Sequence, residues 1–487
     1  MRPTNLLIIM ADQHSPKVLG SYGHPIVRTP HLDKLAGDGV RFTNAYSPSP
    51  LCVPARACFA TGRGADQTGC WDNAHAYDGS VPGWGHRVQA AGHQNVSIGK
   101  LHYRQEVDPV GIDEQIVPMH IAEGKGDLLG AIRPDPPVRH QGRKFAEQVG
   151  PGETVYNRYD RDIAKHACEW LMRRAGEPAT KPWVLFVSFI APHFPLIVPQ
   201  EYFDMYPVGD IPMPKPEDLR HFATHPWWKA FNDSIIIDQF FKDDDHRKIA
   251  IASYLGLCSF VDDFVGDILS TLEETGLAAD TRVAYTSDHG ENLGARGLWG
   301  KSTMHEESAG IPLILRGPDL PQGKVVKTPV SLLDFHPTIL ECIGAPASVD
   351  DADLTGESLL QIAAADDDPD RVVMSQYHGA ASTSAAYMLR QGSYKYVHYV
   401  GFAPELFDLE NDPEEMTNLA DNEQYRSVLE DFEAKLRNIL DPEEIDRRAK
   451  ADQARLVDAH GGREAVLTRG GLHGTPAPGE KPDLASE

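Results

Sequence analysis

The chain has 487 residues, with 46 basic and 71 acidic side chains and a formal net charge of -25. That charge would repel phosphate backbones and anionic lipid surfaces, so we expect neither a nucleic acid nor a membrane as a partner. Hydrophobic residues make up 41% of the sequence, which is enough for a large core and too many for a disordered chain.

The N-terminal segment and the cysteines indicate a cytoplasmic protein. A short apolar run over residues 5–10 ends at Asp12 and lacks the basic start and cleavage site of a signal peptide. No uninterrupted apolar run approaches the roughly 20 residues that a membrane helix needs. The six cysteines have no spacing framework, which argues against a disulfide scaffold.

Short apolar runs alternate with helical patterns through most of the chain. The runs are nearly continuous, so both faces of each strand should be buried, as in a parallel sheet covered by helices. Strands are expected at residues 6–10, 95–98, 183–190, 282–286 and 312–315. Helices are expected at residues 31–37, 52–61, 159–175, 246–276 and 331–343. The alternation predicts an α/β fold with a large mixed, mainly parallel sheet sandwiched by helices.

The composition changes after residue 343. An acidic, loop-like stretch is followed by short strand candidates and one amphipathic helix at residues 424–440, which predict a smaller C-terminal α+β subdomain. We therefore divide the chain into a catalytic domain, residues 1–370, and a C-terminal subdomain with a polar tail, residues 371–487. The tail after residue 440 should either fray or dock on a neighbouring subunit, and the second alternative predicts a homo-oligomer.

Four polar clusters each directly follow a strand candidate. In open parallel sheets, ligands bind beyond the carboxyl ends of the strands, so these clusters should meet at one edge of the sheet. Each cluster alone would more often be a helix cap or a turn, but their recurrence favours a site. The clusters are Asp12-Gln13, Lys100 with His102, Pro192-His193 and Asp288-His289.

A fifth cluster opens the helix expected at residues 52–61. Pro54 suits a first helical turn, and Cys52 would then lie at the helix N-terminus, where the dipole favours a negative atom. A lone cysteine is more often a buried structural residue, and the other five cysteines are assigned that role. Cys52 differs because Pro54 and Arg56 follow it at the second and fourth positions.

The pentapeptide Cys52-Val53-Pro54-Ala55-Arg56 resembles the modification signature of the sulfatase family, in the alkaline phosphatase-like superfamily. In that family a formylglycine-generating enzyme converts the cysteine to formylglycine. The resemblance spans residues 3–440 and implies a formylglycine-dependent, type I sulfatase. Its further motifs, in the order of the family, are Thr29-Pro30-His31-Leu32-Asp33, Gly99-Lys100-Leu101-His102, Ala191-Pro192-His193, Thr286-Ser287-Asp288-His289-Gly290, Gly300-Lys301 and Glu405-Leu406-Phe407-Asp408-Leu409.

The resemblance implies one divalent metal. Asp12, Gln13, Asp288 and His289 match the metal ligands of the family, and the modified Cys52 completes the set. Gln13 stands where many members have Asp, and His289 where many have Asn. Both variants are familiar from the choline-sulfatase-like and phosphonate monoester hydrolase-like branches. Oxygen ligands suit calcium, and an imidazole also suits manganese, so we expect calcium first and manganese second.

The resemblance also implies roles in sulfate binding and proton transfer. Lys100 and Lys301 would neutralise the equatorial sulfate oxygens, and His193 would protonate the leaving alcohol and contact the sulfate. His102 would take a proton from the hydrated formylglycine so that sulfate is expelled. Two further matches, to the residue that holds the formylglycine hydrate and to a substrate-contacting residue, are Arg56 and Asn73.

Three functions are compared. The first is hydrolysis of a small aryl or alkyl sulfate monoester to an alcohol and inorganic sulfate. The alternative is a phosphonate monoester hydrolase or phosphodiesterase with the same nucleophile. In that branch the positions of Lys100 and His102 usually carry neutral hydroxyl side chains, so these two residues favour sulfate. A non-catalytic binding protein with the same fold would be expected to lose motif residues, and the set is complete.

Overall fold

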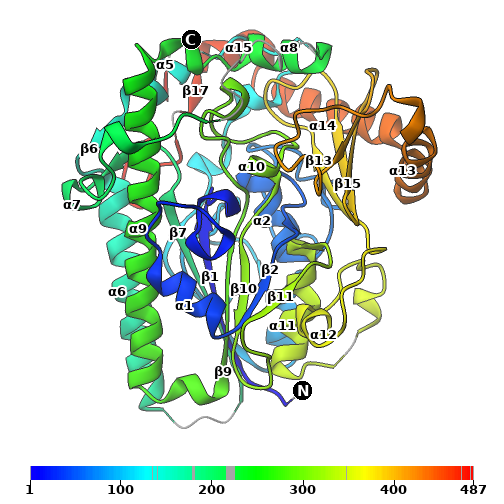
Figure 1. Ribbon diagram of the computed structural model, residues 1–487. Coiled ribbons are helices and arrows are strands. Elements are labelled where there is room, and N and C mark those ends of the chain that lie inside the picture. Colours follow the sequence, from blue (N-terminus) through cyan, green and yellow to red (C-terminus); the bar gives the residue numbers. More distant parts are fainter. Residues whose placement is uncertain are drawn as a thin grey trace.

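The protein is described here by a computed structural model that covers residues 2–133, 135–139, 141–177, 181–214, 225–346, 348–472, 474–482 and 484–485. Its centre is an eight-stranded sheet in the order β11-β2-β10-β9-β1-β7-β4-β5 (Figure 1). Strand β10 is antiparallel to β9 and β2, and the other pairs are parallel, so the predicted mixed, mainly parallel sheet is confirmed. The strands are β1 (Asn5–Asp12), β2 (Val40–Phe42), β4 (Gln94–Lys100), β5 (Glu114–Met119), β7 (Trp183–Pro192), β9 (Thr281–Ser287), β10 (Leu313–Arg316) and β11 (Lys324–Val326).

Helices cover both faces of this sheet, because successive side chains of a strand point to opposite faces. In β1, Leu7 and Ile9 pack into one core, and Leu6 and Ile8 pack into a second core on the other side. The first core is closed by α1 (Pro30–Gly37), α6 (Val155–Ala175) and α9 (Asp244–Glu274). The second is closed by α2 (Cys52–Thr61), α4 (Trp84–Ala90), α11 (Phe335–Ile343) and α12 (Leu359–Ala364).

Helix α9 is long and apolar enough, by length and composition, to cross a membrane, although acidic residues interrupt its apolar run. Its most apolar 18-residue window has a mean hydropathy of 1.4, and 89% of that window is buried inside the fold. The helix packs along α6, β7 and the short strand β8 (Leu196–Val198). Burial in the core accounts for its apolar character.

A smaller antiparallel sheet follows the large one, as predicted for the C-terminal subdomain. Its order is β13-β14-β15-β16, and α13 (Arg426–Ile439) covers it with the buried side chains Phe432 and Leu436. The strands are β13 (Val373–Tyr377), β14 (Ala386–Gln391), β15 (Tyr394–Tyr399) and β16 (Glu405–Asp408).

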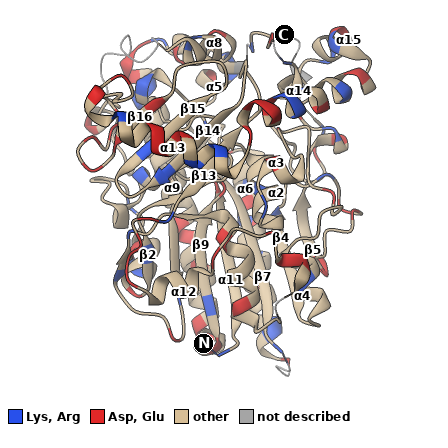
Figure 2. Ribbon diagram, turned by 90° about the vertical axis from the view of Figure 1, so that its right-hand side faces the viewer, with Lys and Arg blue, Asp and Glu red and all other residues tan. Residues whose placement is uncertain are grey.

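The expectation that the polar tail frays or docks on a neighbouring subunit was wrong. The tail forms α14 (Pro442–Ala459), α15 (Gly462–Arg469) and β17 (Gly471–Leu472), and it packs on its own chain. Val457 of α14 and Val466 of α15 are buried against the 3-10 turn η4 (Leu128–Ala131). Lysine, arginine, aspartate and glutamate positions are frequent along α13, α14 and α15, whereas the large sheet has few of them (Figure 2). The polar composition therefore reflects an exposed outer face.

The remaining helices and strands are short: β3 (Ala45–Tyr46), α3 (Ala65–Thr68), α5 (Gln141–Glu147), β6 (Val149–Pro151), α7 (Gln200–Phe203), α8 (Pro226–Ser234), α10 (Glu306–Ala309), β12 (Val330–Ser331) and β18 (Leu484–Ala485).

Candidate functional site

The predicted convergence of the strand ends is confirmed by the register of the sheet. In the pairing of β1 with β7, Asp12 lies opposite Pro192, and in its pairing with β9, Ala11 lies opposite Ser287. Gly99, one residue before Lys100, lies opposite Ser188 of β7. The polar residues after these strands are therefore placed at a single edge.

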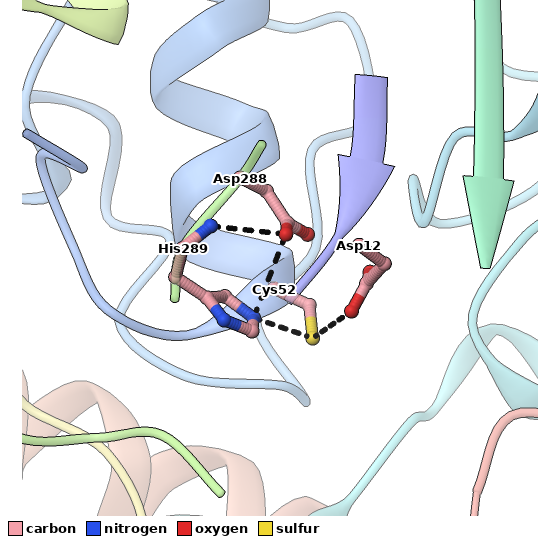
Figure 3. A group of neighbouring side chains, drawn as sticks. All are labelled: Asp12, Cys52, Asp288 and His289. Carbon is pink, nitrogen blue, oxygen red and sulfur yellow. Dashed lines mark hydrogen bonds and ion pairs between the residues drawn. The ribbon is translucent and has the colours of Figure 1, made fainter. Parts of the chain in front are cut away.

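Cys52 begins α2 and lies against residues from two of these strand ends (Figure 3). Its Sγ atom is 3.1 Å from His289 Nε2 and 3.7 Å from Asp12 Oδ1. One ligand atom from each of Asp12, Cys52, Asp288 and His289 lies within 4.8 Å of the others, and all four side chains are buried. Two carboxylates, an imidazole and the residue-52 side chain form a donor set that fits one divalent metal.

Arg56 and Lys100 bind the Oδ2 atoms of the two carboxylates, Asp12 and Asp288, which are called the outer oxygens here. The guanidinium of Arg56 donates to Asp288 Oδ2 at 2.8 Å and to Asp12 Oδ2 at 3.1 Å, and Lys100 Nζ lies 2.7 Å from the same Asp12 oxygen. The remaining guanidinium nitrogen donates to Ser188 Oγ and to the Lys100 carbonyl. Arg56 therefore fixes the two carboxylates, and its predicted contact with the formylglycine hydrate stays a prediction.

Lys301 reaches Cys52 from a separate loop. Its Nζ atom donates to Cys52 Sγ at 2.9 Å and to Gln13 Oε1 at 2.8 Å. The amide nitrogen of Gln13 donates to Glu291, so both ends of this amide have protein partners. The predicted metal role of Gln13 stays a prediction.

The two histidines that are predicted to be catalytic differ in their surroundings. His193 Nδ1 lies 2.6 Å from the Phe194 carbonyl, and its Nε2 lies 3.9 Å from Asp12 Oδ1. His102 Nε2 lies 2.6 Å from Thr475 Oγ1, and its Nδ1 is buried without a hydrogen-bond partner among the described residues. Each side chain is almost wholly buried.

Burial and charge shift the proton affinities of these groups in different directions. Burial, followed by the Lys100 cation, lowers the pKa of His102 well below its usual value. Burial and the Lys301 cation do the same to the pKa of His193, so both imidazoles are neutral in the free site. Burial and the Asp12 charge would raise the pKa of the Cys52 thiol, but Lys301, His289 and Lys100 outweigh them and lower it.

Asn73 supports the N-terminus of helix α2 directly. Its Oδ1 atom accepts a hydrogen bond from the Val53 backbone N–H at 3.1 Å, which satisfies one free donor at the start of α2. Asn73 also lines the pocket, where it was predicted to contact substrate. The structure thus adds a positioning contact to the predicted one.

Four residues of the site were missed by the sequence analysis. Glu291 accepts from Gln13 and from the Gly300 backbone at 2.6 Å, and its signal was its place directly after Asp288-His289-Gly290. Ser188, a partner of Arg56, is a polar residue within the apolar run of β7. Tyr156 and Thr475 lie in no recognisable motif, and no sequence signal marks them.

The site opens into a cavity of ≈190 Å³. Five of the predicted catalytic and substrate-binding side chains besides Asn73 line it, while Asp12, Asp288, His289 and Arg56 do not. Aromatic rings, the ion pair between Asp127 and Arg139, and residues of the C-terminal tail form other parts of the pocket wall. The residues that line the cavity include Cys52, Lys100, His102, His193, Lys301, Tyr156, Phe194, Leu472, Gly474 and Thr475.

Comparison with known proteins gives the same assignment along most of the chain. The family model described as Sulfatase matches residues 4–345, and the model described as N-sulphoglucosamine sulphohydrolase, C-terminal, matches residues 294–441. The choline-sulfatase of Rhizobium meliloti is 31% identical over 86% of this chain and 82% of its own length. The arylsulfatase K of Xenopus laevis is 27% identical over 90% of this chain and 82% of its own length.

Solved structures share the fold. The phosphonate monoester hydrolase of Agrobacterium radiobacter has a TM-score of 0.71 and 23% identity, covering 89% of this chain and 95% of that one. A protein solved in complex with its substrate D-glucosamine-2-N,6-O-disulfate has a TM-score of 0.69 and 22% identity, covering 93% of this chain and 99% of that one. With two thirds of the chain matched by the family model and a relative above 30% identity, the chain belongs to the sulfatase family and is a sulfuric ester hydrolase.

Proposed function

We propose that the chain hydrolyses a small aryl or alkyl sulfate monoester with formylglycine made from Cys52 and with one divalent metal, calcium before manganese. The observation that carries this proposal is the environment of one atom. Cys52 Sγ contacts Lys301 Nζ at 2.9 Å and His289 Nε2 at 3.1 Å in a buried site that also holds two carboxylates. Such a site stabilises a negative oxygen at residue 52 and binds an anionic substrate beside it.

The metal would be held by Asp12, Asp288, His289 and the side chain of residue 52. The outer oxygens of the two carboxylates are occupied by Arg56 and Lys100. The inner Oδ1 atom of Asp12 faces Cys52, and that of Asp288 lies near His289. When bound, the metal supplies positive charge for ionising the nucleophile and for holding a sulfate oxygen.

The histidine that protonates the leaving alcohol must gain a proton first. In the free site His193 is neutral, and its Nδ1 faces the Phe194 carbonyl, so Nε2 is its proton acceptor. An anionic sulfate ester raises the pKa of a neighbouring imidazole. Substrate binding would therefore place the proton on Nε2, from which it passes to the departing alkoxide.

The nucleophile is tested by producing the chain together with a formylglycine-generating enzyme. Mass spectrometry of the peptide with residue 52 should show sulfur replaced by oxygen, and that sample should hydrolyse members of a panel of aryl sulfates, choline sulfate and sugar sulfates. Cys52→Ala should fold and lose nearly all turnover, because no nucleophile remains. Cys58→Ala, a change in the same helix away from the site, is the matched control and should remain active.

Full activity of protein with an unmodified Cys52 would contradict this mechanism. A preference of the modified enzyme for phosphonate esters over sulfates, across several leaving groups, would instead support the alternative function.

The metal is tested by Asp288→Ala. We expect loss of bound metal and loss of turnover together, because the substitution removes a buried ligand and a partner of Arg56. Elemental analysis of the purified protein measures the metal and distinguishes calcium from manganese. The control variant Asp353→Ala removes a carboxylate that pairs with Arg63, outside the metal cluster. It should keep both its bound metal and its turnover. Full metal content in an inactive Asp288→Ala protein would show that the ligand set is misassigned.

Three broader expectations are part of the proposal. A cytoplasmic location is supported by the six cysteines, none of which forms a disulfide. The division at residues 370 and 371 is supported by the start of the second sheet at Val373. A homo-oligomer stays a prediction, which light scattering tests, although the docked tail removes the reason first given for it.

A further inference from the structure

The C-terminal tail reaches the catalytic pocket of its own chain. Leu472, Gly474 and Thr475 line the cavity together with Cys52 and His102. In sequence Thr475 lies 373 positions from His102, with which it forms a side-chain contact. The tail is therefore part of the pocket wall as well as a cover for η4.

Several contacts fix the tail at this place. Tyr156 of α6 donates its hydroxyl to the Thr475 carbonyl at 2.5 Å, and a Cβ atom at Gly474 would lie 2.7 Å from that hydroxyl. Two residues beyond Thr475, Ala477 is buried in the core on the α6 side of the sheet. Before it, β17 pairs with β18 and contacts η4. The position of the Thr475 side chain is thus set from both sides.

His102 is held so that Thr475 is its side-chain partner. The backbone N–H of His102 donates to the Met119 carbonyl at 2.8 Å, and its φ of 59° places it in the left-handed region at the end of β4. Its Nε2 atom is 2.6 Å from Thr475 Oγ1. Its Nδ1 atom is buried and meets no hydrogen-bond partner among the described residues.

A neutral imidazole carries its proton on one nitrogen, and the partner of the other nitrogen decides which one. We propose that the Thr475 hydroxyl accepts a hydrogen bond from His102 Nε2–H, which leaves Nδ1 as a bare proton acceptor. Thr475 is then a positioning residue that acts through His102. The hydrogen bond between His102 and Thr475 does not depend on the proposed function. Only the catalytic use of Nδ1 as a proton acceptor rests on that function.

The first test is kinetic and uses the mature holoenzyme. Thr475→Val keeps the shape of the side chain and removes the hydroxyl, so kcat should fall about 10- to 100-fold. Thr475→Ser restores the hydroxyl and should recover most of that loss. Thr468→Val, on the exposed face of α15 in the same tail, is the matched control and should be neutral.

A double substitution separates the positioning of His102 by Thr475 from the contribution of Thr475 to the pocket wall. In a His102→Ala background Thr475→Val should change kcat by no more than about twofold, because the residue through which it acts is gone. An equal loss in both backgrounds, or a change in KM with kcat retained, would overturn the positioning role. Failure of Thr475→Ser to rescue would also overturn it.

The second test needs no turnover. In protein labelled with 15N-histidine, the nitrogen shifts distinguish a protonated from an unprotonated ring nitrogen, and the His102 signals are those absent from His102→Ala. In the Cys52 thiol form we expect Nε2 protonated and Nδ1 unprotonated, with mixed tautomers in Thr475→Val. A proton on Nδ1 in the unsubstituted protein would refute the proposal even if the enzyme proves to be an active sulfatase. An inactive mature enzyme with the expected tautomer would count against the proposed function alone.

Discussion

Lys100 and Lys301 act on different atoms of the same site. Lys100 pairs with the outer oxygen of Asp12, whereas Lys301 contacts the nucleophile position itself. Both line the pocket, so both are available to the equatorial oxygens of a bound ester. Lys100 therefore links substrate charge to the carboxylate that is expected to hold the metal.

This arrangement predicts discrimination between sulfate and phosphonate monoesters. Both esters carry one negative charge, so selectivity must come from contacts to the equatorial oxygens and from proton transfer. Deleting a preorganised donor typically costs about 10²–10³ in rate. We expect a higher kcat/KM for an aryl sulfate than for the matching phenylphosphonate ester, and Lys100→Ala or His102→Ala should narrow that ratio.

The comparison requires the metal content of each variant, because Lys100 also holds Asp12. Arg87→Ala, which removes a cation from α4 outside the pocket, should leave the ratio unchanged. If both activities fall by the same factor in Lys100→Ala with metal retained, Lys100 has no role in this selectivity.

At the scale of elements, a buried ionic network ties the active-site loop to the small sheet. Lys395 of β15 pairs with Glu306 at 2.9 Å and with Glu415 at 2.8 Å. Arg296 and Lys17 each pair with Glu307 at 2.8 Å. Lys395 lies in the small sheet, Lys17 follows β1 of the large sheet, and the other residues come from the segments on either side of Lys301 and from the turn after β16. The network therefore couples the position of that loop to the C-terminal subdomain.

The network predicts a stability that depends on pH. Burial would raise the pKa of Glu307, but Arg296 and Lys17 outweigh it and lower the pKa from 4.5 to about 2. A group with a depressed pKa stabilises the fold above its unfolded pKa, and that contribution disappears as the pH falls from about 4.5 towards 2. Glu307→Gln should lose roughly 3 kcal/mol at neutral pH, because the buried cation of Arg296 and the half-buried cation of Lys17 each lose a carboxylate partner.

Denaturant unfolding between pH 7 and the acid limit of the fold measures both effects. Stability of Glu307→Gln should vary less with pH below 4.5 than that of the unsubstituted protein. Glu423→Gln breaks an exposed pair with Arg426 and should change stability by less than about 0.5 kcal/mol. Parallel acid profiles for the two Glu307 forms would show that this carboxylate does not contribute.

The elements that the sequence predicted best are strands whose apolar pattern has a single physical cause, which is burial on both faces of the sheet. Strands β1, β7 and β9 are buried on both faces, so their apolar runs and the polar residues after them were readable without the fold. Helix α14 was missed because it buries only one stripe, with Ile445, Ala449 and Val457 four or eight residues apart. That spacing was a usable signal within a polar composition.

At the scale of the whole molecule, the limit of sequence reasoning was long-range contact. Motif residues such as Asp12 and Asp288 were placed correctly because parallel strands end at one edge. Thr475 and Tyr156 could not be placed in the site from the sequence, because only tertiary packing brings the tail to α6 and the pocket. The docked tail is consequently the part of the site whose importance most needs a direct measurement.

Val466→Asp tests whether docking of the tail supports catalysis. Val466 is 1% exposed and packs in the small cluster with Leu128 and Leu129, so a carboxylate there would be buried without a partner. We expect α15 and β17 to detach, which would withdraw Thr475 from His102. Limited proteolysis should cut the tail faster, and kcat should fall at least as far as in Thr475→Val, about 10-fold or more.

Among the described residues, the cluster that contains Val466 includes none from the strands of the large sheet. The free energy of unfolding of the large sheet should therefore change by about 1 kcal/mol or less when the tail opens separately. Val349→Asp is the matched control, because Val349 is 90% exposed and its substitution should affect neither proteolysis nor turnover. A Val466→Asp protein with a cleavable tail and undiminished kcat would show that the pocket works without it. A protected tail with normal turnover would mean that the fold accommodates the carboxylate and that Thr475 stays in place. The double substitution Val466→Asp with Leu467→Asp would then release the tail.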